Sequence, residues 1–291
     1  MIKAWYYKNY KILMFIPIIL TVISLFLISV QYQKTGDIVQ RDVTLKGGVT
    51  ATIYTDHDYR PLEERLKSEL GGTEVIVRKL SELGSDVQTG IIIEVSDIED
   101  DQLKSIIQEE LSIVLTADNY TTERVGSSLG ESFYKQMLTA IVLAFLFMGI
   151  VIFISFRSVL PSFAVIFAAF SDIVMTIAVL NLLNIRISTA GVAALLLLIG
   201  YSIDTDVVLS TRVLKRKESS LDERVKSSLQ TGLTMTFTTI VALSLGYFFS
   251  NSPVLQQMFL IVIIGLFFDL INTWMMNLGL LLWYVKKKNV E

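Results

Sequence analysis

The chain has 291 residues, of which 52% are hydrophobic and 18% are charged, and it contains no cysteine. Soluble proteins carry about 25% charged residues, so this composition favours a membrane protein. The lack of cysteine excludes disulfides, thiol catalysis and thiolate metal sites. Residues 31–132 hold 20 acidic and 10 basic side chains, whereas the rest of the chain holds 8 acidic and 15 basic ones. The sequence therefore joins an acidic soluble segment to a membrane segment with basic flanks, and its charge gives no indication of nucleic-acid binding.

Six apolar runs are long enough to cross a bilayer, which requires about 20 residues for each helix. They cover residues 12–30, 136–156, 159–180, 187–209, 229–249 and 254–284. The first run has no charge over 19 residues and is not followed by a small-residue cleavage site. We therefore expect a retained transmembrane helix rather than a secretory signal peptide.

Basic residues near the ends of these runs predict the orientation of the protein. On one side of the predicted bundle lie Lys3, Lys8, Lys11, Arg157, Arg212, Lys215, Arg216, Lys217, Arg224, Lys226 and Lys286 to Lys288. The short loops on the other side contain Arg186 alone. We therefore expect a multi-pass protein of the cell membrane with both termini in the cytoplasm and residues 31–132 outside.

The outer segment has the pattern of a small α/β domain. The stretches "GGVTATIYT", "TEVIVRKL" and "TGIIIEV" read as strands, and "YRPLEERLKSEL" has leucines at every fourth position, as an amphipathic helix does. A second helix, "DIEDDQLKSIIQEEL", has Asp97 as its candidate N-cap. A last strand is expected within residues 112–115 or 120–125. The order β-α-β-β-α-β is typical of a ferredoxin-like fold.

The predicted fold is thus an α-helical membrane bundle of six transmembrane helices with an extracytoplasmic α+β ferredoxin-like domain between helices 1 and 2. Residues 1–30 form the cytoplasmic N-terminus and the first helix, and residues 31–132 form the outer domain. Residues 133–285 contain the other five helices, and residues 286–291 are a cytoplasmic tail.

Four aspartates lie within the apolar runs: Asp172, Asp204, Asp206 and Asp269. A charged aspartate in mid-bilayer costs about 2.5–3.5 kcal/mol, so a base, water or a bound proton must compensate for each one. A rise of 1.5 Å per residue puts Asp172 near the midplane, where the runs offer no base. Asp204 and Asp269 are expected to share a level nearer the cytoplasm, and Asp206 is expected near the inner surface with Arg212.

Two interpretations of these polar residues stay open. Asp172 serves either ion or proton coupling or a structural hydrogen bond. Asp204 and Asp206 either take part in coupling or cap a helix end, with Arg212 and Lys215 as their partners. The row formed by Thr231, Thr234, Thr238 and Thr239 either lines a hydrated path or bonds back to its own helix.

The order of these features resembles the SecF family, the smaller partner of SecD in protein export, within the resistance-nodulation-division superfamily of proton-coupled transporters. The stretches that carry the resemblance are "LKGGV" (45–49), "VGSSLGESF" (125–133), "SDIV" (171–174), "GYSIDTD" (200–206) and "TMTFTTIVALSLGYFF" (234–249). Bacterial members usually read GYSxNDT and then VVxxDR, whereas this chain lacks the acid before Arg212. It also has Asp269 where bacterial members are usually small and neutral, so the pattern is closer to the archaeal branch.

The resemblance implies a subunit that assists protein translocation beside a SecD-like membrane subunit and a protein-conducting channel. Its outer domain would engage the translocating polypeptide, and the proton motive force would drive its movement through the intramembrane carboxylates. By position, the family's proton-relay acid falls on Asp172 and its basic site on Arg212, while Asp204, Asp206 and Asp269 complete the predicted coupling residues. No enzymatic activity, cofactor or metal is implied, and the single His57 is expected to be a solvated surface side chain.

Three other functions remain to be considered. A half-size exporter of lipids or small molecules from the same superfamily would carry a larger outer domain with an apolar cleft. An intramembrane aspartyl protease would need two acids facing each other at one depth, together with GxGD and tyrosine-aspartate motifs that this sequence lacks. A purely structural scaffold subunit is the third. Six spans also resemble half of a twelve-span transporter, so we expect a six-span partner.

Overall fold

The computed structural model describes residues 2–71, 75–81, 87–96, 98–215, 220–250 and 252–288. The candidate N-cap Asp97, together with Gly72, Arg216 and Lys217, lies outside these described residues. Six helical segments are long and apolar enough to cross a membrane, and each contains one of the predicted runs or nearly all of it. They cover Asn9–Thr35, Ser127–Phe156, Val159–Leu182, Thr189–Leu214, Leu221–Phe249 and Val254–Lys287.

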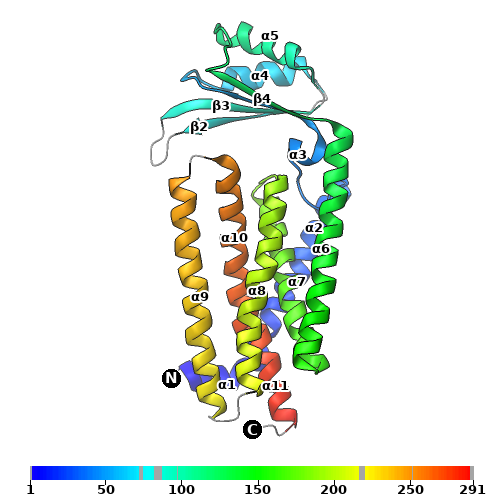
Figure 1. Cartoon of the computed structure of the whole chain (residues 1–291), viewed down its shortest axis with the longest axis vertical. Coiled ribbons are helices and arrows are strands. Elements are labelled where there is room, and N and C mark those ends of the chain that lie inside the picture. Colours follow the sequence, from blue (N-terminus) through cyan, green and yellow to red (C-terminus); the bar gives the residue numbers. More distant parts are fainter. Residues whose placement is uncertain are drawn as a thin grey trace.

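The long helices stand side by side as an upright bundle, and the sheet lies above one end of it (Figure 1). The upright helices are α2 (Phe15–Thr35), α6 (Ser127–Phe156), α7 (Val159–Leu182), α8 (Thr189–Lys215), α9 (Leu221–Phe249) and α10 (Pro253–Ile271). A π-helical segment, η1 (Asn272–Asn277), joins α10 to α11 (Leu278–Lys288). The short helix α1 (Ile2–Leu13) lies across the end of the bundle farthest from the sheet.

The elements between α2 and α6 form a four-stranded sheet with two helices on one face (Figure 1). In chain order they are α3 (Val43–Lys46), β1 (Gly48–Ile53), α4 (Arg60–Glu69), β2 (Val75–Ser81), β3 (Gln88–Val95), α5 (Asp100–Leu111) and β4 (Tyr120–Val125). The strand order is β2-β3-β1-β4, and all three pairings are antiparallel. Of the two places considered for the last strand, the chain uses residues 120–125.

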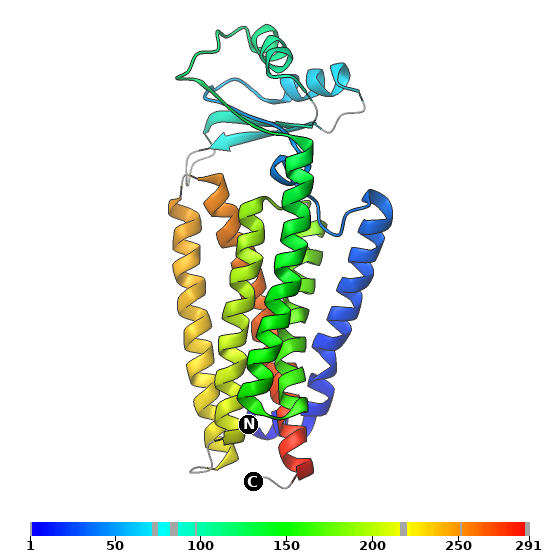
Figure 2. The ribbon, with the colours of Figure 1, turned by 45° about the vertical axis from the view of Figure 1, so that its right-hand side comes forward.

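The core of the outer segment follows from the alternation in its strands. Val49, Ala51 and Ile53 of β1 are buried because every second side chain faces α4 and α5. Leu62 and Leu66 come from α4 to meet them, and all five belong to one hydrophobic cluster. The opposite face of the sheet is turned toward the membrane bundle (Figure 2).

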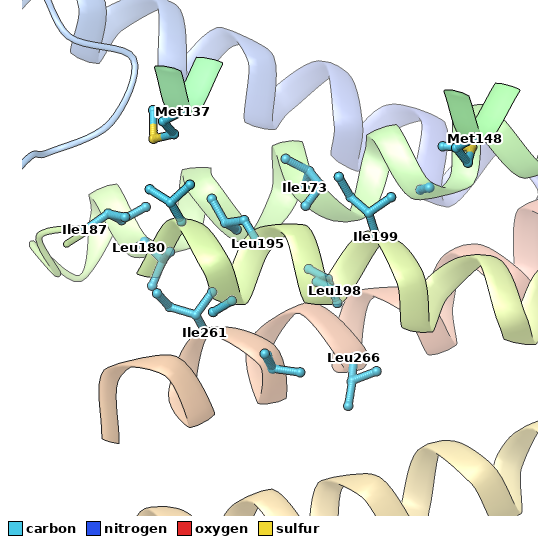
Figure 3. Packing of buried hydrophobic residues seen from close by; sticks show 14 of the residues in the cluster. Met137, Met148, Ile173, Leu180, Ile187, Leu195, Leu198, Ile199, Ile261 and Leu266 are labelled. Carbon is cyan, nitrogen blue, oxygen red and sulfur yellow. The ribbon is translucent and has the colours of Figure 1, made fainter. Parts of the chain in front are cut away.

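Helices α6, α7, α8 and α10 share the main core of the bundle (Figure 3). Leu195, Leu198 and Ile199 of α8 pack between side chains of the neighbouring helices, among them Ile173 of α7. A Cβ atom at Gly265 of α10 would lie only 2.1 Å from a methyl carbon of Leu198. The glycine therefore lets α8 and α10 approach closely, which is a common use of small residues between membrane helices.

Two glycines join the outer segment to the membrane bundle. Gly47 follows α3 with a φ of 89°, which favours glycine. A Cβ atom at Gly130 of α6 would lie 2.5 Å from the backbone nitrogen of Gly47, so the two backbones are in contact. Arg41 adds ion pairs to Asp37 at 2.7 Å and to Glu131 of α6 at 3.1 Å.

The segment that leaves α2 is also bonded to the loop between α7 and α8. Ile187 N–H donates to the Gln40 carbonyl at 2.7 Å, and Asp42 N–H donates to the Ile187 carbonyl at 3.1 Å. The side-chain amide of Asn181 donates to the Ile38 carbonyl at 3.0 Å and accepts from Gln40 N–H at 3.2 Å. The outer segment is thus attached to the two helices, α7 and α8, that carry three of the four membrane aspartates.

Candidate functional site: a buried carboxyl cluster

Asp172 lies in the interior of the bundle, and its side chain is fully buried. The Ser202 hydroxyl of α8 donates to Asp172 Oδ2 at 2.6 Å, and the Asn272 amide of η1 donates to Asp172 Oδ1 at 2.5 Å. Ser171 beside it donates to Asn272 Oδ1 at 3.4 Å and pairs with Thr21 of α2. Four helical elements therefore meet around this one carboxyl group.

Asp206 and Asp269 share a second part of the same buried region. The Thr273 hydroxyl lies 2.8 Å from Asp206 Oδ1 and 3.2 Å from Asp269 Oδ1, so it joins α8 and α10. The Asn277 amide also donates to Asp206 Oδ1, at 2.7 Å. All four side chains are fully buried. We call Asp172, Asp206 and Asp269 the carboxyl cluster.

The π-helical segment η1 supplies most of the donors in the cluster. Its Asn272, Thr273 and Asn277 side chains all point to aspartates, and each is fully buried. The backbone N–H of Leu278 bonds to the carbonyl of Thr273, five residues earlier, instead of the α-helical four. Such π segments inside α-helices are frequent at functional sites, because the wider turn re-aims the side chains that follow.

The cluster keeps several oxygens without a donor. Asp206 Oδ2, Asp269 Oδ2 and Asn277 Oδ1 are buried and have no hydrogen-bond partner. Among the described residues, no lysine or arginine forms a salt bridge to any of the three aspartates. Buried carboxylates at membrane depth need compensation. The arrangement is therefore chemically suited to taking up protons.

The structure assigns different surroundings to Asp204 and Arg212. Asp204 is on the exposed surface of α8, and α8 continues to Lys215. The interpretation in which Asp204 and Asp206 cap a helix end is therefore wrong. Arg212 Nη1 donates to the Ser227 carbonyl at 2.7 Å and to the Thr231 hydroxyl at 2.8 Å, both on α9. It therefore links two helix ends and does not contact the cluster.

The expected depths do not by themselves predict which acids meet. The sequence puts Asp269 level with Asp204 and places Asp206 nearer the inner surface with Arg212, and in the structure it is Asp206 that shares Thr273 with Asp269. A fixed rise per residue ignores helix tilt and the direction of each side chain, so it cannot decide which of two acids two residues apart faces the interior.

An aspartyl protease would need two acids that face each other at one depth, and Asp206 and Asp269 are the two acids that share a bonded side chain, Thr273. The motif argument is unaffected, because the sequence lacks both the GxGD and the tyrosine-aspartate motif.

Three of the four threonines in the α9 row bond as the simpler interpretation predicts, whereas Thr231 accepts from Arg212 of α8. Thr234 donates to the Gln230 carbonyl at 2.7 Å, Thr238 to the Thr234 carbonyl at 2.8 Å, and Thr239 to the Met235 carbonyl at 2.9 Å. These hydroxyls bond back to their own helix. They do not contact the carboxyl cluster.

Sequence reasoning missed Ser202, Asn272, Thr273 and Asn277. A signal was present, since "DLINTWMMN" places four polar residues inside the last apolar run. Elsewhere, His57 has a half-exposed side chain and lies 2.7 Å from the Thr55 hydroxyl through Nδ1. Among the described residues, no group of three or more His, Cys, Asp or Glu side chains is placed to hold a metal ion.

Comparison with known proteins identifies the family. A family described as "Protein export membrane protein SecD/SecF, C-terminal" matches residues 106–287. The protein-export membrane protein SecF of Methanocaldococcus jannaschii is 35% identical, and the match covers 96% of each chain. SecF of Pyrococcus furiosus is 36% identical over 94% of this chain and 90% of its own. These names denote protein-export membrane proteins and no enzymatic activity.

The fold also matches a solved structure. The crystal structure of SecDF, a translocon-associated membrane protein from Thermus, superimposes on 97% of this chain with a TM-score of 0.72 at 19% sequence identity. This chain spans 38% of that longer chain. The six apolar helices, the matched family and the near full-length relatives agree with one another: the chain belongs to the SecF family of protein-export membrane proteins.

Proposed function

We propose that this protein assists the translocation of polypeptides across the cell membrane and that proton uptake and release by the carboxyl cluster drives its movement. The observation that carries the proposal is the burial of Asp172, Asp206 and Asp269 in one place, with orphaned acceptor oxygens. Neutral hydroxyl and amide donors cannot cancel three charges, so a bound proton is the simplest compensation in a low-dielectric interior. The names of the family relatives support export rather than lipid or drug efflux.

The outer segment is proposed to be the ferredoxin-like domain of the extracytoplasmic side, which engages the translocating polypeptide. Its antiparallel strand order β2-β3-β1-β4 supports this fold. Lysine and arginine side chains gather near the helix ends on one side of the bundle, which supports an orientation in which both termini are cytoplasmic. The outer segment is hydrogen-bonded to α7 and to the α7–α8 loop, and these bonds offer a direct route by which a change at Asp172 or Asp206 reaches the outer domain.

A SecD-like subunit is the proposed membrane partner, together with the protein-conducting channel. The exposed side chains of α8 include Ala193, Leu197 and Asp204, with Gly200 on the same stripe at spacings of three and four residues. A Cβ atom at Gly200 would meet nothing within 4 Å, so open space lies beside this stripe. An aspartate turned toward lipid is costly, and a partner helix that presents a donor would remove that cost.

A second copy of this chain fits the stripe less well than a different subunit does. A twofold interface along α8 would put Asp204 near its own symmetry mate, because such interfaces bring the same surface together. Two carboxylates at one depth repel each other. The charge of this surface therefore favours a partner with a base or a hydroxyl at the level of Asp204.

Export kinetics of Asp172→Asn cells test the proposal. The substitution keeps the shape of the side chain and removes its ability to ionise. We expect export in the presence of the partner subunits to slow to the rate seen without this protein, and the remaining export to lose its dependence on the proton gradient. Asp118→Asn, at an exposed loop position, is the control and should behave as wild type. Wild-type rates with unchanged ionophore sensitivity for Asp172→Asn would remove Asp172 from the mechanism.

A further inference from the structure

The N-terminal helix α1 is hydrogen-bonded to η1, the segment that supplies donors to the carboxyl cluster. The Tyr6 hydroxyl donates to the backbone carbonyl of Trp274 at 2.7 Å, although the two residues are 268 positions apart. Trp274 lies in the middle of η1, between Thr273 and Asn277. A residue at the far end of the bundle from the sheet is thus bonded to the segment that supplies the donors of the cluster (Figure 1).

The bonded carbonyl belongs to the residue whose α-helical donor the π turn redirects. In a regular α-helix, the N–H of Leu278 would donate to the Trp274 carbonyl, four residues earlier. Here that N–H donates to Thr273 instead. The Trp274 carbonyl therefore loses its α-helical donor, and a buried carbonyl without a donor is costly. The Tyr6 hydroxyl supplies this carbonyl with a donor.

Further contacts to Trp274 come from α9 and from α1. A Cβ atom at Gly232 of α9 would lie 2.5 Å from the Trp274 ring, so this glycine makes room for the indole. Tyr10, one turn after Tyr6 on α1, is buried in the same hydrophobic cluster as Trp274. The π segment is therefore in contact with both α1 and α9.

The register of η1 decides where its side chains point. A return to α-helical bonding would turn the residues after the π turn by about 100° relative to those before it, the rotation of one residue in an α-helix. Asn272 and Asn277, five residues apart, would then lie about 140° apart around the helix, so the two could not both face the buried aspartates as they do at 2.5 and 2.7 Å. The donors of the cluster depend on the π register, and the π register depends on a donor for the Trp274 carbonyl.

We propose that Tyr6 is a positioning residue for the carboxyl cluster: its hydroxyl holds η1 in the π-helical register that presents Asn272, Thr273 and Asn277 to the three aspartates. The role of the cluster in coupling rests on the proposed function, but the geometric effect of Tyr6 does not. The ionisable groups that face the cluster are its own aspartates from α7, α8 and α10. From α2, Thr21 adds only a hydroxyl, through Ser171, and η1 adds amides and a hydroxyl.

Infrared titration of the full chain in lipid vesicles, with isotope-labelled aspartate, tests the proposal. Protonated buried carboxyl groups give a separate C=O band whose pH midpoint reports the balance of donors around them. Tyr6→Phe keeps the ring and removes only the hydroxyl. We expect it to move the midpoint by about 0.5 pH unit or more. Tyr32→Phe, an exposed tyrosine at the other end of the membrane segment, should leave the midpoint unchanged.

Gly232→Ala provides an independent second variant, because its methyl group would displace the Trp274 ring from the α9 side. It should also move the midpoint, while Gly149→Ala, whose methyl group would make only an ordinary contact, should not. A wild-type midpoint in both Tyr6→Phe and Gly232→Ala would overturn the proposal. This holds even if the two variants have lower melting temperatures, because a contact that only stabilises the fold lowers the melting temperature without moving the midpoint. If Asp172→Asn leaves export unchanged, the proposed function fails while this titration still decides the role of Tyr6.

Discussion

Asp172 and Asn272 are both fully buried, and the Asn272 amide donates a hydrogen bond to the Asp172 carboxyl group. Asn272→Leu removes the amide that donates to Asp172 Oδ1. We expect the free energy of unfolding to fall by about 1–3 kcal/mol, the cost of leaving a buried acceptor unsatisfied. Thermal or denaturant unfolding of the full chain in detergent measures this change.

The double variant Asp172→Leu/Asn272→Leu tests the cause of that loss. It replaces both partners with apolar groups, which can be nearly neutral in a buried site, so most of the lost stability should return. The remaining partner, Ser202, can bond to a carbonyl of its own helix. If the stability lost in the double variant equals the sum of the losses in Asp172→Leu and Asn272→Leu, the two residues are not specifically paired.

At the scale of elements, the contact between α3 and α6 joins the outer segment to the membrane. Gly130→Ala would put a methyl group 2.5 Å from the backbone nitrogen of Gly47 and 2.8 Å from the carbonyl carbon of Lys46. Backbone atoms cannot rotate away, so the two elements must separate. We expect a loss of about 1–3 kcal/mol of stability, as for other overpacked sites, and faster hydrogen exchange in α3.

Gly126→Ala is the matched control for Gly130→Ala. It lies just before the same helix, and its added methyl group would meet nothing within 4 Å. Its stability and exchange rates should match those of wild type. Equal behaviour of the two variants would show that the glycine contact does not hold the outer segment in place.

At the scale of the whole molecule, a substitution at Asp204 distinguishes an effect on folding from an effect on association with a partner subunit. Its side chain is exposed in the isolated chain, so Asp204→Leu should leave the melting temperature of the purified protein unchanged or raise it. The proposed SecD-like partner would lose its contact with the Asp204 carboxylate. We expect association with the SecD-like subunit to weaken at least about tenfold, equivalent to about 1.4 kcal/mol, in a titration in lipid nanodiscs.

The substitution Asp118→Leu, at an exposed position of the outer segment, is the control for that titration. Wild-type affinity in both variants would show that the stripe of α8 around Asp204 is not the partner surface. A lower melting temperature of the isolated Asp204→Leu chain would show instead that Asp204 contributes to the fold itself.

The sequence by itself determined the elements of this protein and its family. Six apolar runs had to become six helices, because in lipid each backbone group must find its hydrogen bond within the segment. Alternation in "GGVTATIYT" predicted β1, and the leucine spacing of "YRPLEERLKSEL" predicted α4. The sequence also indicated that Asp172, Asp206 and Asp269 lie within the membrane, since their neighbours along the chain are apolar.

Only the tertiary structure decided which of these acids meet. Asp204 and Asp206 are two residues apart on α8, and a rotation of about 200° between them turns one outward and the other to Thr273 and Asn277. Local sequence predicts a helix, but not which of its faces the other helices cover. The π register of η1 likewise depends on Tyr6, at the other end of the chain. Such long-range contacts are formed by packing, and so the carboxyl cluster is a property of the folded bundle.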